Sequence, residues 1–376
     1  MTRGFPPAEF EARVIRIQQG MARNGLGALL LTCEADIRYV TGFLTRFWES
    51  PTRPWFVVVP AEGAPIAVIP SIGAALMGTT WIRDIRTWPA PVPEDDGIAL
   101  LAETLCEVGG PVGMPSHLES HLRMPLAHFD RLRQICDLRF GPDHGIVAGT
   151  RAIKSAAEVS RIERICATAG RAFDRVGEIA GQGVPLSHVF RDFQCLLLQE
   201  GADWVPYLAG GAGPDGYADV ISPATDKALD GGDVLMLDTG AVFDGYFCDF
   251  DRNFAIGHVT RGGQSAHARL LDAVRAGHDA ARPGARACDL WRAMAQVVGS
   301  DAQDGRLGHG LGTQLTEGLS LIAADETVLI PGMVLTLEPA VKTGQGRIMV
   351  HEEVIVITTD GARQITPEAP AQIPVL

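Results

Sequence analysis

The chain has 376 residues, of which 46% are hydrophobic, and this apolar content is enough for two sizeable cores. Its formal net charge of −13 argues against a nucleic-acid partner, because contact with a phosphate backbone requires clustered Lys and Arg. Seven scattered cysteines, no apolar signal segment and no run of about eighteen apolar residues lead us to expect a reduced, cytoplasmic protein without membrane contact.

The first part of the chain shows an α/β pattern. Residues 8–25 have the periodicity of an amphipathic helix. Residues 28–32, 55–59 and 65–69 are short apolar runs that are typical of buried strands. Helical and strand patterns that alternate in this way predict a domain in which helices pack on a sheet.

The second part begins with a helix signal. A connection with glycine and proline around 141–150 leads to Ser155 and Glu158, which have the spacing of a capping box. We predict a long helix from there to about residue 180, and we divide the chain into domains 1–148 and 149–376. Two further helices are expected at about 266–281 and 287–298, and the remainder is mostly strands and turns.

One predicted hairpin carries three carboxylates. A buried strand ends near Asp238, Asp244 and Gly245 have the composition of a two-residue turn, and residues 246–251 form the returning strand. Two strands joined in this way bring Asp238 and Asp249 together. Because side chains alternate along a strand, Asp251 is expected on the same face as Asp249.

Further candidate ligands follow in the C-terminal third. His309 lies in a glycine-rich loop, where small neighbours allow the backbone to approach a ligand closely. Glu338 ends a strand that a proline stops, and Glu352 and Glu353 lie within another strand. Alternation places these last two glutamates on opposite faces, so only one of them can face the same centre as the other acids.

Four carboxylates and one imidazole form an oxygen-rich set that suits hard or borderline divalent ions. The set consists of Asp238, Asp249, His309, Glu338 and Glu352. These residues could instead be ordinary surface acids of an acidic protein. Several lie inside apolar strand patterns, however, where an unpaired carboxylate costs several kcal/mol to bury. A bound cation removes that cost, and we therefore predict a metal site.

The order of these motifs resembles that of the pita-bread metallopeptidases, which include aminopeptidase P, prolidase, methionine aminopeptidase and creatinase. The resemblance covers essentially the whole chain. It is carried by Arg151-Ala-Ile-Lys154-Ser155, Gly232-Asp233, Asp238-Thr-Gly240, Asp249 with Arg252, His309-Gly-Leu-Gly312, Pro331-Gly-Met333, Leu337-Glu-Pro339 and, as a strand and turn, Ile37–Phe43. It implies an α/β creatinase-type N-terminal domain, an α+β pita-bread catalytic domain and a homodimer.

The resemblance also implies a role for each ligand. Asp238 would bind one metal ion, Asp249 and Glu352 would bridge two, and His309 and Glu338 would complete the shell. Mn, Co, Fe and Zn all suit these ligands. In the resembling enzymes the position of Glu338 also relays a proton, which makes it our candidate general base.

The chain departs from the family pattern at three positions. Ile221 and Thr316 stand where the peptidases have histidines that contact the substrate, and Val350 stands for an arginine. Arg347 and His351 lie near the last position. Losing one donor to a transition state commonly costs roughly a hundredfold or more in rate. The departures leave the metal ligands intact and bring peptide-specific catalysis into question.

Other residues are candidates for substrate contact. Trp204 and Tyr207 precede a glycine run and are expected in the pocket wall, and Thr316 and His351 occupy positions close to family contacts. In the segment 47–55, aromatic side chains and Arg53 would select a substrate, or the segment is a proline-rich turn whose tryptophans cover their own domain.

Asp251 is a candidate catalytic residue. Family members often have a hydroxyl residue at this position, and a third acid on the hairpin could bind metal, orient water or meet a cationic substrate. The alternative is a salt bridge between Asp251 and Arg252.

Three functions remain open. The first is a metal-dependent hydrolase of the Xaa-Pro aminopeptidase or dipeptidase type, which acts on a small peptide. The second is a non-peptidase hydrolase or lyase that acts on a small nitrogenous or zwitterionic metabolite, and it accounts better for Ile221 and Thr316. The third is a binding module, but relatives that have lost catalysis have also lost ligands, and this chain has not.

Overall fold

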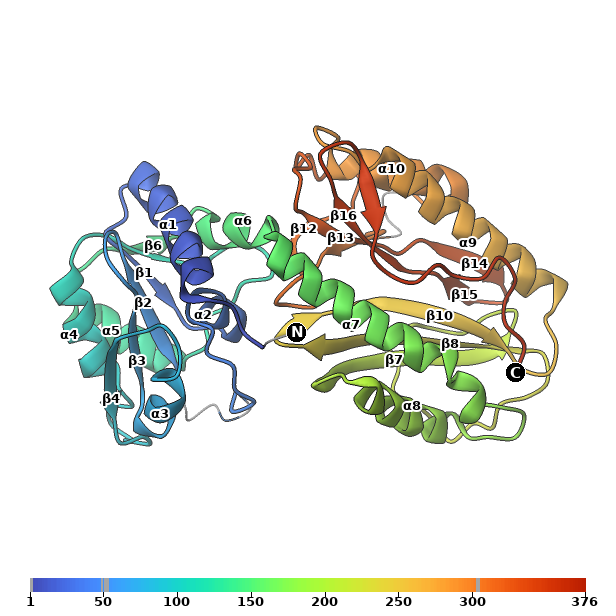
Figure 1. Ribbon diagram of the computed structural model, residues 1–376, viewed down its shortest axis with the longest axis horizontal. Coiled ribbons are helices and arrows are strands. Elements are labelled where there is room, and N and C mark those ends of the chain that lie inside the picture. Colours follow the sequence, from blue (N-terminus) through green and yellow to red (C-terminus); the bar gives the residue numbers. More distant parts are fainter. Residues whose placement is uncertain (1–2, 49, 51–53, 302–304) are drawn as a thin grey trace. The chain divides into compact units, whose positions relative to one another are not determined.

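The computed structural model describes all residues except 1–2, 49, 51–53 and 302–304, and the chain forms two compact units (Figure 1). The first unit is Met1–Arg151 and the second is Ala152–Leu376. The candidate selector Arg53 lies outside the described residues. Trp55 from the same segment is buried against Phe43 and Trp48, so this tryptophan covers its own unit.

The first unit is built on a mixed six-stranded sheet with strand order β4-β3-β2-β1-β5-β6. Its strands are β1 (Ala28–Leu31), β2 (Phe56–Pro60), β3 (Ile66–Pro70), β4 (Asp84–Trp88), β5 (Val112–Met114) and β6 (Phe140–Pro142). Its helices are α1 (Pro7–Asn24), α2 (Glu34–Thr41), α3 (Ala74–Met77), α4 (Ile98–Val108), α5 (Leu126–Ile135) and α6 (Ile146–Ala152).

Alternation along the central strands divides the apolar side chains of this sheet between two cores. Leu29 and Leu31 of β1 pack into a cluster with Ile17 of α1. Leu30 between them packs into a second cluster with Leu101 of α4. Because successive side chains point to opposite faces, both faces of the sheet are covered by helices.

The expectation of a strand and turn at Ile37–Phe43 is wrong, because these residues begin inside α2. Glu34 and Asp36 in the first turn suit the positive end of a helix. Gly42 ends the helix in the left-handed region at φ 78°, and its N–H donates to the Arg38 carbonyl at 2.8 Å. Tyrosine, valine and threonine gave this segment the appearance of a strand, and burial of Tyr39 and Val40 offsets their weak helix propensity.

The second unit contains two main sheets. The first has the order β10-β8-β7, with β9 paired to β8, and the second has the order β12-β11-β13-β16-β17; β14 and β15 form a separate ribbon. The bounds are β7 (Trp204–Pro214), β8 (Asp233–Phe243), β9 (Tyr246–Phe247), β10 (Phe250–Ala255), β11 (His309–Gly310), β12 (Glu317–Ser320), β13 (Val334–Leu337), β14 (Ala340–Gly344), β15 (Arg347–Val350), β16 (Glu353–Ile357) and β17 (Ala362–Gln364).

Helices cover the outer faces of these sheets. Figure 1 shows α7 (Ala156–Asp174) and α8 (Leu186–Glu200) against β7 and β8, and α9 (Arg261–Ala280) with α10 (Ala287–Val298) on the other side of the unit. Apolar residues of α10 form a core with β13 and β16. The strands therefore have an inner side, between the two helical layers, on which polar side chains can gather.

The helix signals in the sequence are largely confirmed. The capping box of Ser155 and Glu158 is present in both directions. The third predicted helix matches α10. The second begins earlier than expected, at Arg261, because the Thr260 hydroxyl accepts from the N–H of Gly263 and caps a first turn that contains two glycines. No helix in the described part of the chain is long and apolar enough to cross a membrane.

Candidate metal centre

The predicted carboxylate hairpin is confirmed. Strands β8 and β10 pair antiparallel with Asp251 opposite Asp238. Asp244 and Gly245 connect β8 to β9 with φ values of 51° and 82°, the left-handed conformation that a two-residue hairpin turn requires. The register therefore brings the carboxylates of Asp238, Asp249 and Asp251 to the inner side of the sheet, with Asp249 and Asp251 buried.

Three of the predicted ligands converge from different strands. Ligand atoms of Asp249, His309 and Glu352 all lie within 4.8 Å of one another, and all three residues are buried. His309 Nε2 is 3.3 Å from Asp249 Oδ2 and 4.0 Å from Glu338 Oε1. His309 Nδ1 lies 3.0 Å from the Gly310 carbonyl, which can only accept, so this nitrogen carries the proton and Nε2 offers its lone pair.

Asp238 completes this group from β8. The Tyr207 hydroxyl donates to Asp238 Oδ2 at 3.0 Å, while Asp238 Oδ1 is buried without a hydrogen-bond partner. Burial, and then the nearby acids, raise the pKa of Tyr207, so it remains a donor. Burial and the charge of neighbouring carboxylates also raise the pKa values of Asp238, Asp249 and Glu352 well above the ordinary range.

The donor set fits divalent cations. Asp238 Oδ1 and Glu352 Oε1 are both buried and unpartnered, and leaving such oxygens unsatisfied is costly. A cation bound between these strands would satisfy both oxygens and remove the mutual repulsion of the acids. Asp238, Asp249, His309, Glu338 and Glu352 are the residues that would hold it.

Asp251 lies on the buried side of the centre, which we call the closed side. Its Oδ1 accepts from the Glu352 N–H at 3.0 Å and lies 3.4 Å from His351 Nδ1, and its Oδ2 is buried without a partner. The alternative of a salt bridge to Arg252 is wrong. The Arg252 guanidinium donates to the backbone carbonyl of Asp251 at 2.7 Å and pairs with the carboxylate of Glu353 at 3.1 Å.

His351 occupies a different place from the substrate contact that we expected. Its side chain is only 1% exposed, and its Nε2 lies 3.1 Å from Glu353 Oε1. Burial disfavours the charged imidazole, but the carboxylates of Asp251 and Glu353 outweigh burial and raise the pKa of His351. The reason for the error is that Glu352 faces the centre, so His351 before it and Glu353 after it are directed into the interior.

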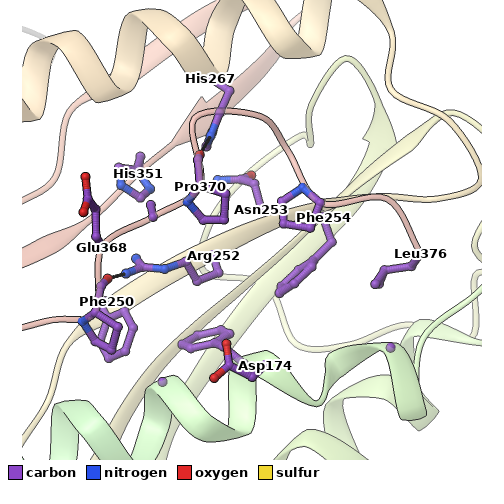
Figure 2. Close-up of a pocket in the computed structure, with 16 residues that line it drawn as sticks. Asp174, Phe250, Arg252, Asn253, Phe254, His267, His351, Glu368, Pro370 and Leu376 are labelled. Atoms are coloured by element: carbon purple, nitrogen blue, oxygen red, sulfur yellow. Dashed lines mark hydrogen bonds between the residues drawn. The ribbon is translucent and has the colours of Figure 1, made fainter.

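A cavity of about 310 Å³ lies behind this closed side, between α7, β10 and the segment 367–376. Figure 2 shows Arg252 and His351 among the residues that line it. None of the five predicted metal ligands, all of which the structure describes, lines this cavity. It is therefore separate from the place where a substrate would meet the centre.

The open side of the centre is formed by Glu338 and Arg306, whose side chains are 23% and 38% exposed. Arg306 Nε lies 3.3 Å from Glu338 Oε1, and Arg306 Nη2 donates to the Thr316 hydroxyl at 3.4 Å. Sequence reasoning missed Arg306. The available signal was a basic residue three positions before the candidate ligand His309.

Trp204 and Tyr207 lie on β7, the strand that pairs with β8. Trp204 is opposite Val242 at the start of β7, beyond Tyr207, which is opposite Gly240. Ile221 is 80% exposed in the connection between β7 and β8. Of the two predicted pocket-wall residues, Tyr207 contacts the proposed ligand Asp238 through a hydrogen bond.

Comparison with known proteins identifies the family of this centre. Residues 160–360, more than half of the chain, match the model of metallopeptidase family M24. The chain belongs to metallopeptidase family M24. Residues 13–153 match the creatinase/prolidase N-terminal domain, so the M24 protein has the two-part organisation that the sequence predicted: a creatinase-type α/β domain followed by a pita-bread catalytic domain.

Relatives of this M24 protein extend over nearly its full length. The probable dipeptidase PepE of Mycobacterium tuberculosis is 27% identical over 96% of this chain and 95% of its own. The Xaa-Pro dipeptidase of Pyrococcus horikoshii is 24% identical over 94% and 96%. The crystal structure of dipeptidase PepE from Mycobacterium ulcerans superposes with a TM-score of 0.84, at 26% identity over 99% of each chain. The protein is thus an M24 metallopeptidase that resembles Xaa-Pro dipeptidases.

Proposed function

We propose that this M24 protein is a dinuclear metal-dependent hydrolase that cleaves the amide bond of small Xaa-Pro peptides. The observation that carries the proposal is the pair of buried, unpartnered oxygens, Asp238 Oδ1 and Glu352 Oε1, beside Asp249 and His309. Five ligands of this kind accept Mn, Co, Fe or Zn. The Xaa-Pro preference rests on the named activity of the Pyrococcus relative.

The chemistry divides between the cations and the chain. Divalent ions held by Asp238, Asp249, His309, Glu338 and Glu352 would supply the chemistry that polarises the attacked group and makes water acidic near neutral pH. Glu338 takes the proton of that water and passes it to the leaving nitrogen. Burial raises the pKa of Glu338, with His309 and Arg306 acting in the opposite direction. The Glu338 side chain is partly exposed, which supports its role on the side from which a substrate would approach.

Asp251 is proposed as a further acid of the centre. Its Oδ1 is held by the Glu352 N–H, and its unpartnered Oδ2 would be available to a cation or to a water molecule. Tyr207, by its hydrogen bond to Asp238, is proposed to line the substrate pocket together with Trp204 and Thr316.

The second candidate function is hydrolysis or lysis of a small nitrogenous or zwitterionic metabolite. Two observations favour it: the side chain of Ile221 is exposed and carries no donor, and Thr316 presents a hydroxyl where a peptidase would have an imidazole. A substrate smaller than a peptide would need fewer donors around the attacked group.

The test is proline release from a panel of Xaa-Pro dipeptides and tripeptides by Mn-loaded enzyme, with Glu338→Ala as the blank. We expect turnover that the blank abolishes. The absence of turnover, in protein that binds about two ions per chain, would contradict peptide cleavage and favour the metabolite hydrolase.

A further inference from the structure

We propose that Arg306 is a catalytic residue that donates to the anionic oxygen formed on the substrate, and that Thr316 positions it. This inference rests on the proposed function. In the resembling peptidases a histidine at the position of Thr316 steadies the attacked carbonyl. Here the hydroxyl of Thr316 accepts from Arg306 at 3.4 Å, so the positive donor comes from a neighbouring residue instead.

The backbone beside Arg306 is fixed relative to the centre. The N–H of Leu307 donates to the Leu321 carbonyl at 2.8 Å, and the Leu307 carbonyl accepts from the N–H of Glu338 at 3.0 Å. Leu307 itself is 2% exposed. The backbone of Arg306 therefore lies directly next to that of Glu338. Two hydrogen bonds of the neighbouring residue Leu307 hold it there.

Thr316 is held by its neighbour. Glu317, the first residue of β12, is buried and pairs with Lys154 Nζ at 2.7 Å, and it also accepts the N–H of Thr313 at 3.1 Å. Because Glu317 points inward, Thr316 before it faces the open side, where its hydroxyl meets Arg306. A threonine is too short to replace an imidazole, but its oxygen can orient a longer donor.

The guanidinium has donors left for a substrate. A guanidinium carries five N–H groups, and the contacts with Glu338 and Thr316 use two of them. Its positive charge reaches the reacting region, because Arg306 Nε lies 3.3 Å from Glu338 Oε1. A permanently charged, planar donor on the exposed side is suited to an anionic oxygen.

The reaction creates such an oxygen. When the water oxygen bonds to the carbonyl carbon, the C=O electron pair moves to the carbonyl oxygen, which becomes negative. When the C–N bond then breaks, that pair re-forms C=O and the leaving nitrogen takes the proton held by Glu338. A donor placed for the intermediate stabilises it more than the ground state and so affects kcat more than KM.

The experiment compares Arg306→Ala, Arg306→Lys and Thr316→Val with the control Arg275→Ala, an exposed arginine of α9 that pairs only locally with Asp272. All variants are first checked for metal content and melting temperature. For Arg306→Ala we expect kcat for an Xaa-Pro dipeptide to fall roughly a hundredfold or more with little change in KM. We expect smaller losses for the other two test variants and none for the control.

A second readout does not depend on turnover. The affinity of the metal-loaded protein for inorganic phosphate is measured by calorimetry. We expect it to fall at least about tenfold in Arg306→Ala, because a charge-assisted hydrogen bond is lost, and to stay unchanged in Arg275→Ala. If the wild-type protein turns over no Xaa-Pro peptide but phosphate binding still depends on Arg306, the proposed substrate is wrong and the role of Arg306 stands.

Two results would overturn the inference. The first is an Arg306→Ala variant whose kcat and phosphate affinity both stay within about threefold of wild type. This is the range expected if Arg306 forms only an exposed ion pair with Glu338 and does not contact the substrate. The other comes from the double variant Arg306→Ala/Thr316→His, in which a restored imidazole should recover at least about tenfold of the lost kcat. No recovery would refute the equivalence of Arg306 with the relatives' histidine.

Discussion

Replacing His351 with leucine tests whether the closed side of the centre is a structural support. The imidazole, only 1% exposed, lies between Asp251 at 3.4 Å and Glu353 at 3.1 Å. Leucine occupies a similar volume, so the substitution removes the shared partner of two buried carboxylates without emptying the site. Removing one partner of a buried ion pair costs about 3–5 kcal/mol.

The expected loss is large enough to measure by thermal unfolding. For a unit the size of Ala152–Leu376, each kcal/mol shifts Tm by roughly 2–4 °C, so the Tm should fall by roughly 6–20 °C. The assay is a melting curve of chelator-treated protein, so that a bound ion cannot mask the loss. The control is His278→Ala on α9, whose imidazole is partly exposed and 3.8 Å from Asp279, and which should stay within about 0.5 kcal/mol of wild type. A Tm change in His351→Leu as small as in the control would refute the proposed support.

Three further outcomes are expected around the centre. Tyr207→Phe removes the donor to Asp238 Oδ2 and should weaken metal binding about tenfold or more in titration calorimetry, with the fold unchanged by circular dichroism. Removing metal with a chelator should lower Tm, because the buried acids lose their counter-charge; equal melting curves with and without metal would contradict a metal site. Asp251→Asn should lower metal content or activity, and a variant with full metal content and full activity would rule out a catalytic Asp251.

Much of the fold could be predicted from short-range signals. A short apolar run identified β1, the turn at Asp244 and Gly245 identified the hairpin, and the capping box of Ser155 and Glu158 identified the start of α7. The prediction of a strand at Ile37–Phe43 was wrong because the residue types of this segment favour strands. The interior into which α2 packs decides its conformation, and this information lies elsewhere in the chain.

The site could be predicted where residues interact locally and was missed where contacts are long-range. The face shared by Asp249 and Asp251 follows from alternation alone. The burial of His351 between Asp251 and Glu353 does not, because it depends on which residues of other segments surround the imidazole. The place of Arg306 three residues before His309 suggests a residue near the centre, but only the fold shows that it lies next to Glu338.

The proposed metal ligands come from two separate sheets, so metal content should report whether the two sheets are packed together. Asp238 and Asp249 belong to the hairpin of β8 and β10, whereas His309, Glu338 and Glu352 come from β11 and from the ends of β13 and β16. Ions held by both groups would fasten one sheet to the other. A substitution in the apolar core between α10 and the second sheet should therefore lower metal content even though it changes no ligand residue. Loss of metal would then report the separation of the two sheets.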